Sequence, residues 1–264
     1  YDNTLGGVTD IVLTHVSADG STLIGSTFLG GADSDGLNQM FANYGEQYRG
    51  EIFLDGANNI IIASCSSSSD FPVTSGAFQS VLGGGQDGVL AAMSPNCGSL
   101  LWSSFLGGSG EDNALGIRLA LDGAIIATGS TESTDFPTTA GSYHPAPFGG
   151  RDGYVVRMSP GATGMVAGTH FGTANDDGSY FVDTNFADDI WIYGQTDGSI
   201  PISPSGTYGQ ADGPIFIAKL TADLSSVPIT TTIGPVGGGG FGGGTVPVAF
   251  LVDVCDNIYI SGYN

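Results

Sequence analysis

Pairs of acidic residues recur at three places in the chain, each shortly after a short apolar stretch that contains or precedes Gly. Hard cations such as Ca²⁺ prefer clustered carboxylate and carbonyl oxygens, so the pairs are candidate metal ligands. They equally suit tight turns, because an Asp side chain accepts hydrogen bonds from nearby backbone N–H groups. A feature that recurs in every repeat is usually structural, which favours the turn interpretation. The pairs are Asp33 with Asp35, Asp176 with Asp177, and Glu111 with Asp112.

Any calcium bound by these pairs should be held weakly. A tight site needs six to eight oxygens, and isolated turn carboxylates correspond to affinities on the order of 10⁻⁴ to 10⁻³ M. Asp33 with Asp35 is the first candidate, since Gly36 follows it directly. No other cofactor is expected, because the three His residues are scattered and lie at no zinc-ligand spacing from Cys or carboxylates.

A second candidate site is a segment at residues 38–50, which interrupts the regular order of the chain. It carries large aromatic side chains and one of only five basic residues. Aromatic residues and Arg commonly anchor interfaces, so the segment is a candidate binding surface. The alternative, that it only packs against its own repeat, stays open. The candidate binding residues are Phe41, Tyr44, Tyr48 and Arg49.

The elements that must position these residues are short β-strands in repeated units. The units start near residues 10, 87, 152 and 212, and each contains a hairpin, a connection and a second hairpin. The strands are β-branched or apolar runs bounded by Gly and Asp, as is typical of hairpins. Loop insertions are expected at 38–50 and 234–246. Four Asp residues are predicted to begin the turn of the second hairpin, namely Asp55, Asp122, Asp183 and Asp253.

Four strands per unit predict an all-β chain built from four-stranded antiparallel sheets. One such sheet cannot bury both of its faces, so neighbouring sheets must pack face to face. Radial packing gives a β-propeller, which leaves only short and protected edges. We expect the second hairpin of one unit and the first hairpin of the next to share a blade. The chain, residues 1–264, is then one propeller domain, either closed with four blades or, as we favour, part of a larger propeller.

The best-preserved unit, Asp87 to Pro137, resembles a known family. Its pattern Asp-Gly-Val-Leu, Ser-Pro, Leu-Leu-Trp-Ser-Ser-Phe-Leu-Gly-Gly-Ser-Gly-Glu-Asp, Asp-Gly and Asp-Phe-Pro is similar to the bacterial seven-bladed β-propeller repeat. The resemblance extends over nearly the whole chain and weakens where Ser199-Ile200-Pro201 replaces Asp-Phe-Pro. It implies part of a large secreted or surface protein, commonly of Bacteroidota and often exported by type IX secretion. It says little about activity, because the shared residues are structural.

Charge restricts the partners. The chain has 26 acidic against 5 basic residues and a net charge of -21. Nucleic acid is excluded as a partner because phosphate binding needs clustered Lys and Arg. No apolar run reaches the roughly 18 residues of a membrane span. We therefore expect a non-catalytic extracellular or cell-surface module that binds other domains of the same surface protein or surface glycans. The alternative is a propeller-fold glycan lyase or hydrolase.

Overall fold

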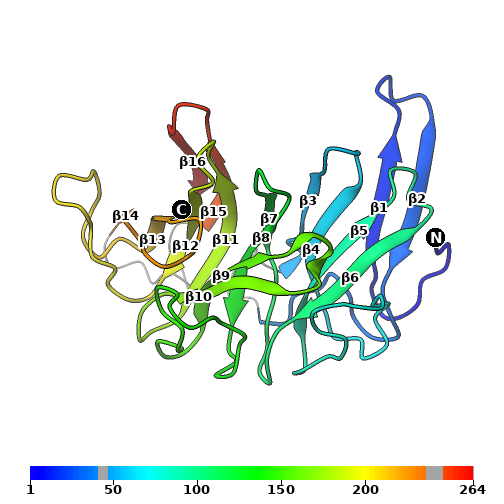
Figure 1. The fold of residues 1–264 in the computed structure, drawn as a ribbon, viewed down its shortest axis with the longest axis horizontal. Helices are drawn as coiled ribbons and strands as arrows, with labels where there is room; N and C mark the ends of the chain where they lie inside the picture. The colour runs from blue at the N-terminus through cyan, green and yellow to red at the C-terminus, as the bar shows by residue number, and fades with distance from the viewer. Residues whose placement is uncertain (41–46, 236–245, 264) are drawn as a thin grey trace.

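The computed structural model describes residues 1–40, 47–235 and 246–263, and its named elements there are sixteen β-strands and one 3₁₀ turn at Pro160–Ala162 (Figure 1). Three complete sheets account for twelve strands. The first contains β3 (Glu51–Leu54), β4 (Ile60–Ser66), β5 (Asp87–Met93) and β6 (Leu100–Leu106). The second contains β7 (Gly116–Leu119), β8 (Ile125–Thr131), β9 (Asp152–Met158) and β10 (Met165–Phe171). The third contains β11 (Asp177–Thr184), β12 (Ile190–Thr196), β13 (Ile215–Leu220) and β14 (Ile229–Ile233).

Each complete sheet is an antiparallel meander in which strands adjacent in sequence are adjacent in space. The prediction that the second hairpin of one unit shares a sheet with the first hairpin of the next is confirmed. The pairing that joins them keeps one register. Ile60 lies opposite Met93 between β4 and β5, and Ile125 lies opposite Met158 between β8 and β9.

Two further sheets have only two strands. β1 (Ile11–Val16) pairs with β2 (Leu23–Leu29), and β15 (Val246–Val252) pairs with β16 (Ile258–Tyr263). These hairpins lie at opposite ends of the array (Figure 1), in separate sheets. A ring closed with four blades would require β16 to pair with β1. The array is therefore open in this structure.

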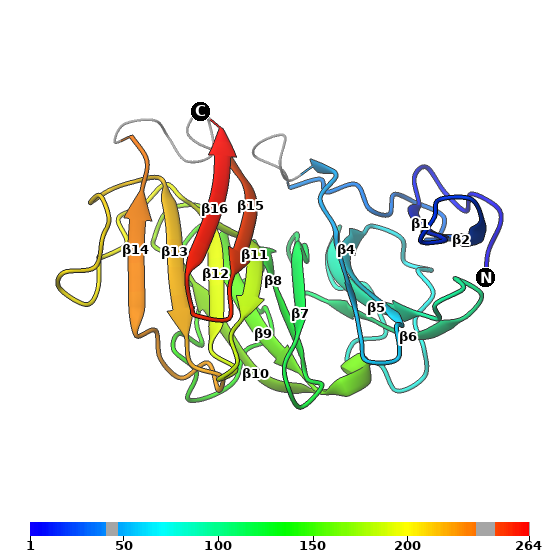
Figure 2. The same ribbon diagram turned by 90° about the horizontal axis from the view of Figure 1, so that it is seen from above.

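The sheets fan out from their first strands, as the view from above shows (Figure 2). Strand β7 contacts β3 on one side and β11 on the other, and β11 contacts β15. Apolar side chains fill the space between successive sheets. Ile61 and Leu90 of the first sheet pack with Ile117 and Tyr154 of the second, all nearly inaccessible to solvent. The second sheet thus packs against the first sheet on one face and against the third sheet on the other, as a repeat array requires.

A polar network crosses the four first strands. The Glu51 carboxylate on β3 accepts hydrogen bonds from the Ile117 N–H (2.9 Å) and from Arg118 Nη1 (2.6 Å) on β7. Arg118 Nε also bonds Asp183 Oδ1 on β11 at 3.2 Å. The other Asp183 oxygen accepts the N–H of Val252 on β15 at 2.8 Å. Because these side chains are mostly buried, each charge depends on its partners for solvation.

Asp183 is therefore not a turn residue, and that prediction is wrong. The turn before Ile190 has five residues, as the other three turns do, but β11 continues to Thr184 and the turn begins at Asn185. Asn185 Oδ1 accepts the N–H groups of Ala187 and Asp189 there. The other three are turn residues, as predicted, and Asp55 and Asp253 begin their turns, whereas Asp122 is the third residue of a turn that begins at Ala120. The Oδ1 atoms of Asp55, Asp122 and Asp253 each accept a backbone N–H two residues further along, at 2.8 to 2.9 Å.

Candidate functional site

The second acid of each predicted pair is a buried carboxylate that closes a turn. Asp35 accepts the Gly31 N–H (2.7 Å), Asp112 the Gly108 N–H (2.7 Å) and Asp177 the Thr173 N–H (2.5 Å). All three turns follow the last strand of a sheet. Ser68 and Ser133 hydroxyls also donate to Asp35 and Asp112, which ties each turn to the next connection. This arrangement agrees with the turn interpretation of the pairs.

These buried acids meet an acid far away in sequence. A side chain built at Gly30 would place its Cβ 2.6 Å from both Asp10 Oδ1 and Asp35 Oδ2. One at Gly107 would lie 2.6 Å from Asp87 Oδ1 and 2.8 Å from Asp112 Oδ2. Two carboxylates thus converge where only Gly fits. Burial raises the pKa of Asp112 to about 6 and also raises the pKa of Asp35 and Asp87.

The first acids of the pairs have different surroundings. Asp33 and Asp176 are exposed, and Asp176 Oδ1 accepts the Arg151 N–H at 3.0 Å. Glu111 is half-buried, which raises its pKa. Within residues 1–40, 47–235 and 246–263, no three His, Cys, Asp or Glu side chains are grouped to hold a metal ion. Calcium binding at the pairs remains a prediction.

The segment at 38–50 contributes two predicted binding residues to the described structure, since Phe41 and Tyr44 lie outside it. Tyr48 is 75% exposed, as a binding residue should be. Arg49 is not available to a ligand. Its guanidinium lies 3.5 Å from the centroid of the Phe181 ring, and its Nε donates to the Tyr180 carbonyl at 3.0 Å. Burial there lowers the pKa of Arg49 to about 10. Arg49 therefore fastens the segment to β11.

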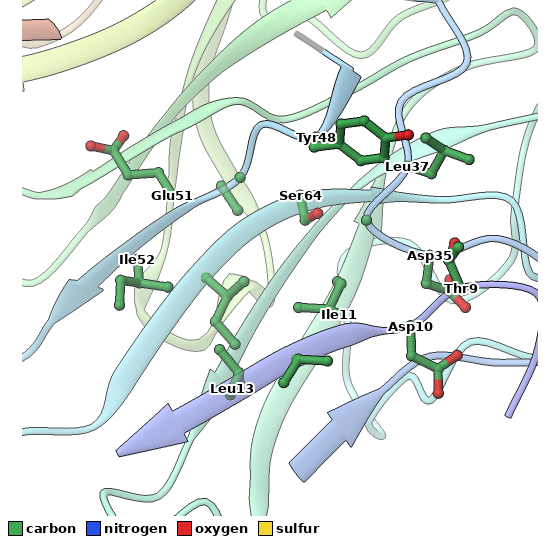
Figure 3. A pocket seen from close by; sticks show the side chains of 15 residues that line it. Thr9, Asp10, Ile11, Leu13, Asp35, Leu37, Tyr48, Glu51, Ile52 and Ser64 are labelled. Atoms are coloured by element: carbon green, nitrogen blue, oxygen red, sulfur yellow. The ribbon is translucent and has the colours of Figure 1, made fainter. Parts of the chain in front are cut away.

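Tyr48 stands beside a groove between β1 and the hairpin β3–β4. The groove consists of two adjoining cavities of about 420 and 760 Å³, which share Val12, Leu13 and Ile52 in their walls. Figure 3 shows the smaller cavity, with Ile11 and Leu13 of β1 on one side and Ile52 on the other. The groove lies along the edge of β1 that pairs with no described strand.

The two ends of the groove differ in charge. The acidic residues Asp10, Asp35 and Glu51 are among those that line the smaller cavity near Tyr48, although the Glu51 carboxylate points away from it (Figure 3). The larger cavity is lined by apolar and neutral polar residues together with His15, whose Nδ1 lies 2.6 Å from the Pro95 carbonyl. Such a groove suits an extended apolar segment. The sequence did not single out Ile52 and Leu54, because their exposure depends on the neighbouring sheet.

His170 also departs from the repeat and was not singled out. It lies on β10 at the position where β6 has Phe105, and both are almost completely buried. Its Nδ1 lies 3.6 Å from Asp152 Oδ2. Burial lowers the pKa of His170 to about 4 and raises the pKa of Asp152 to about 6. A substrate cannot reach this pair from solvent, so the break in the repeat indicates altered packing.

A comparison of the chain with protein-family models and with curated proteins finds no match. The described residues include no helix long and apolar enough to cross a membrane.

Proposed function

We propose that the chain is a non-catalytic β-propeller module of an extracellular or cell-surface protein, which presents a binding surface to neighbouring protein domains or surface glycans. The observation that carries the proposal is the fan of four-stranded antiparallel sheets around their first strands (Figure 2). This arrangement holds the connecting loops on a rigid scaffold. The acidic composition suits a protein kept soluble by self-repulsion outside the cell.

The binding surface centres on Tyr48 at the acidic end of the groove. An exposed aromatic side chain beside carboxylates offers a sugar ring an apolar face and hydrogen-bond acceptors together. Binding should be measured on immobilised surface polysaccharides and on intact cells. Tyr48→Ala should lose about tenfold or more in affinity, whereas Tyr208→Ala, at an exposed Tyr between β12 and β13, should bind as the unchanged protein does. Equal binding by all three proteins would contradict this site.

A glycan lyase or hydrolase is less well supported. Glycosidases use paired carboxylates that flank the scissile bond. The carboxylates that converge in the described structure, such as Asp87 with Asp112, are buried and close turns. Incubation with the bound polysaccharide should therefore release no reducing ends or unsaturated products. Product release that persists in Tyr48→Ala but is lost in Asp112→Asn would favour the lyase or hydrolase.

A further inference from the structure

The hairpins at the two ends of the array each lack half of a sheet. Among the described strands, β1 pairs only with β2, and β16 pairs only with β15. Each of these two strands therefore has one edge along which no described strand pairs. The complete sheets show which strand belongs at each edge. There the second strand pairs with the third, as β4 pairs with β5. β16 corresponds to a second strand and β1 to a third, so the two edges are complementary.

The internal repeats also specify the register of that pairing. Ile258 of β16 corresponds to Ile60, because each pairs with the last residue of the strand before it. Val16 of β1 corresponds to Met93, and Ile60 lies opposite Met93. Transferred to the open edges, this register places Ile258 opposite Val16 and Ile260 opposite Thr14.

The sheet faces beside these edges carry exposed apolar side chains that their counterparts bury. Ile52 on β3 is 61% exposed, whereas Ile117, at the same position on β7, is fully buried against the preceding sheet. Tyr259 on β16 is 55% exposed, whereas Ile61, at the same position on β4, is 3% exposed against the following sheet. The face of β15–β16 thus lacks a following sheet, and the face of β3–β4 lacks a preceding hairpin.

One arrangement pairs the two open edges and covers the two exposed apolar faces. A β15–β16 hairpin placed in the groove between β1 and β3–β4 pairs its edge with β1 and turns Tyr259 and Leu251 toward Ile52. The larger cavity, about 760 Å³ in volume, is where that hairpin would lie. No carboxylate lines this cavity. The net charge of -21 makes two copies repel each other over the rest of their surfaces, and salt screens this repulsion.

We propose that a second copy of this chain fills the groove, with β16 of one copy pairing antiparallel with β1 of the next to complete a four-stranded sheet. The contact is head-to-tail, so it either closes a ring of copies or continues as a chain of them. It needs no external ligand and therefore goes beyond the proposed function. Main-chain hydrogen bonds at the edge supply affinity, and the flanking apolar pockets supply specificity.

Sedimentation of the purified chain at 0.5 M NaCl, over a range of concentrations, tests the association. We expect a mass that rises from the 26.7 kDa of one chain to at least twice that value. Ile52→Lys and Leu251→Lys alter opposite halves of the contact at exposed positions, and each alone should remain monomeric. Their equimolar mixture should associate again, because the Leu251→Lys chain keeps an unaltered groove and the Ile52→Lys chain keeps an unaltered β15–β16 hairpin. Val81→Lys, at an exposed position in the β4–β5 connection, is the matched control and should associate normally.

Cysteine cross-linking tests the register, on a Cys255→Ser background that removes the exposed thiol. Directly opposed Cα atoms lie about 4.5 to 5.5 Å apart, within disulfide range. A mixture of Thr14→Cys and Ile260→Cys chains should therefore form interchain disulfides. A mixture of Thr14→Cys and Ile258→Cys chains should not form them, because position 258 lies about 7 Å along the strand from the residue opposite position 14.

Three results would overturn the proposal. One is a monomer at every concentration. Another is association that Ile52→Lys leaves unchanged while its thermal unfolding matches that of the parent. The third is a Thr14→Cys, Ile260→Cys double variant that forms its disulfide within a single chain, which would mean that the array closes on itself. Binding to polysaccharide by Tyr48 is measured separately, so its failure would leave the self-association result standing.

Discussion

At the scale of single residues, Asp177 should make stability depend on pH. Burial raises the pKa of Asp177 to about 7, against about 4 for an Asp in an unfolded chain. Between these values the folded chain holds a proton that the unfolded chain has released. The free energy of unfolding therefore falls as pH rises from about 4 to about 7, by up to about 1.4 kcal/mol per pH unit for one proton. Asp177→Asn should flatten this fall, measured by urea unfolding at pH 5, 6, 7 and 8.

Asp176→Asn is the matched control, because Asp176 is the exposed neighbour and the charge change is identical. It should keep the pH slope of the parent. His170 contributes with the opposite sign, since burial lowers its pKa to about 4, and its stabilisation is lost as pH falls from about 6.5 toward 4. Only the difference between variant and parent isolates Asp177. Equal slopes in the two Asn variants would contradict the assignment.

The acids also show where residue-level prediction succeeds and fails. The turn role of Asp55 could be read from the sequence because its acceptors are backbone N–H groups two and four residues away. Asp183 also follows an apolar run, but it lies within β11, two residues before the turn begins at Asn185, and pairs with Arg118, 65 residues away. Arg49 was a candidate binding residue, and it lies over the Phe181 ring of another sheet. Contacts that depend on how sheets stack leave no signal in the local pattern of residues.

At the scale of strands, the network through Glu51 should stabilise the contact between β3 and β7. Glu51→Gln keeps the shape of the side chain but leaves Arg118 with only Asp183 as a charged partner. Breaking a mostly buried ion pair costs more than breaking an exposed one, so we expect a loss of about 2 to 3 kcal/mol in the free energy of unfolding. Glu132→Gln removes the partly exposed partner of Arg151 and should cost under about 1 kcal/mol. Chemical denaturation of both variants measures the two values.

Comparable losses in these two variants would mean that the Glu51 network is no stronger than a surface ion pair. A larger loss of unfolding free energy for Glu51→Gln, with an unchanged circular dichroism spectrum of the folded state, would show that contacts between the first strands stabilise the array.

Strand positions and their grouping into sheets were predictable, because each run of β-branched and apolar residues ends at a Gly or Asp and the order repeats. Strand β5 begins at Asp87 and β9 at Asp152, at the predicted unit starts. The groove was not predictable. Ile52 and Ile117 occupy equivalent strand positions, and only the presence of a preceding sheet makes one buried and the other exposed. The sequence pattern indicates which face of a strand is apolar but not whether another sheet covers that face.

At the scale of the whole molecule, the five sheets form an open array with a two-stranded hairpin at each end (Figure 1). The second sheet, β7–β10, packs against a complete sheet on each side, whereas the end hairpins have a neighbouring sheet on one side only. Stability is therefore expected to be lowest at the ends, as in other repeat arrays. Amide hydrogen exchange should be faster in β1 and β16 than in β8 and β12. Association between copies should slow exchange in β1 and β16 alone, and uniform exchange across the strands would contradict this gradient.

The net charge of -21 gives the last prediction. Self-repulsion destabilises the compact state, so added salt should raise the melting temperature. The second acid of each pair accepts a backbone N–H with Oδ2, as Asp112 does from Gly108, and its Oδ1 is buried without a hydrogen-bond partner. Such oxygens are far fewer than the six to eight that a tight calcium site needs. We therefore expect 10 mM CaCl₂ to raise the melting temperature no more than NaCl matched for ionic strength, with EDTA as the reference. A melting temperature higher by several degrees in calcium would instead show specific binding. If Asp35→Asn abolished that excess while Asp70→Asn did not, the site would be the turn that Asp35 closes.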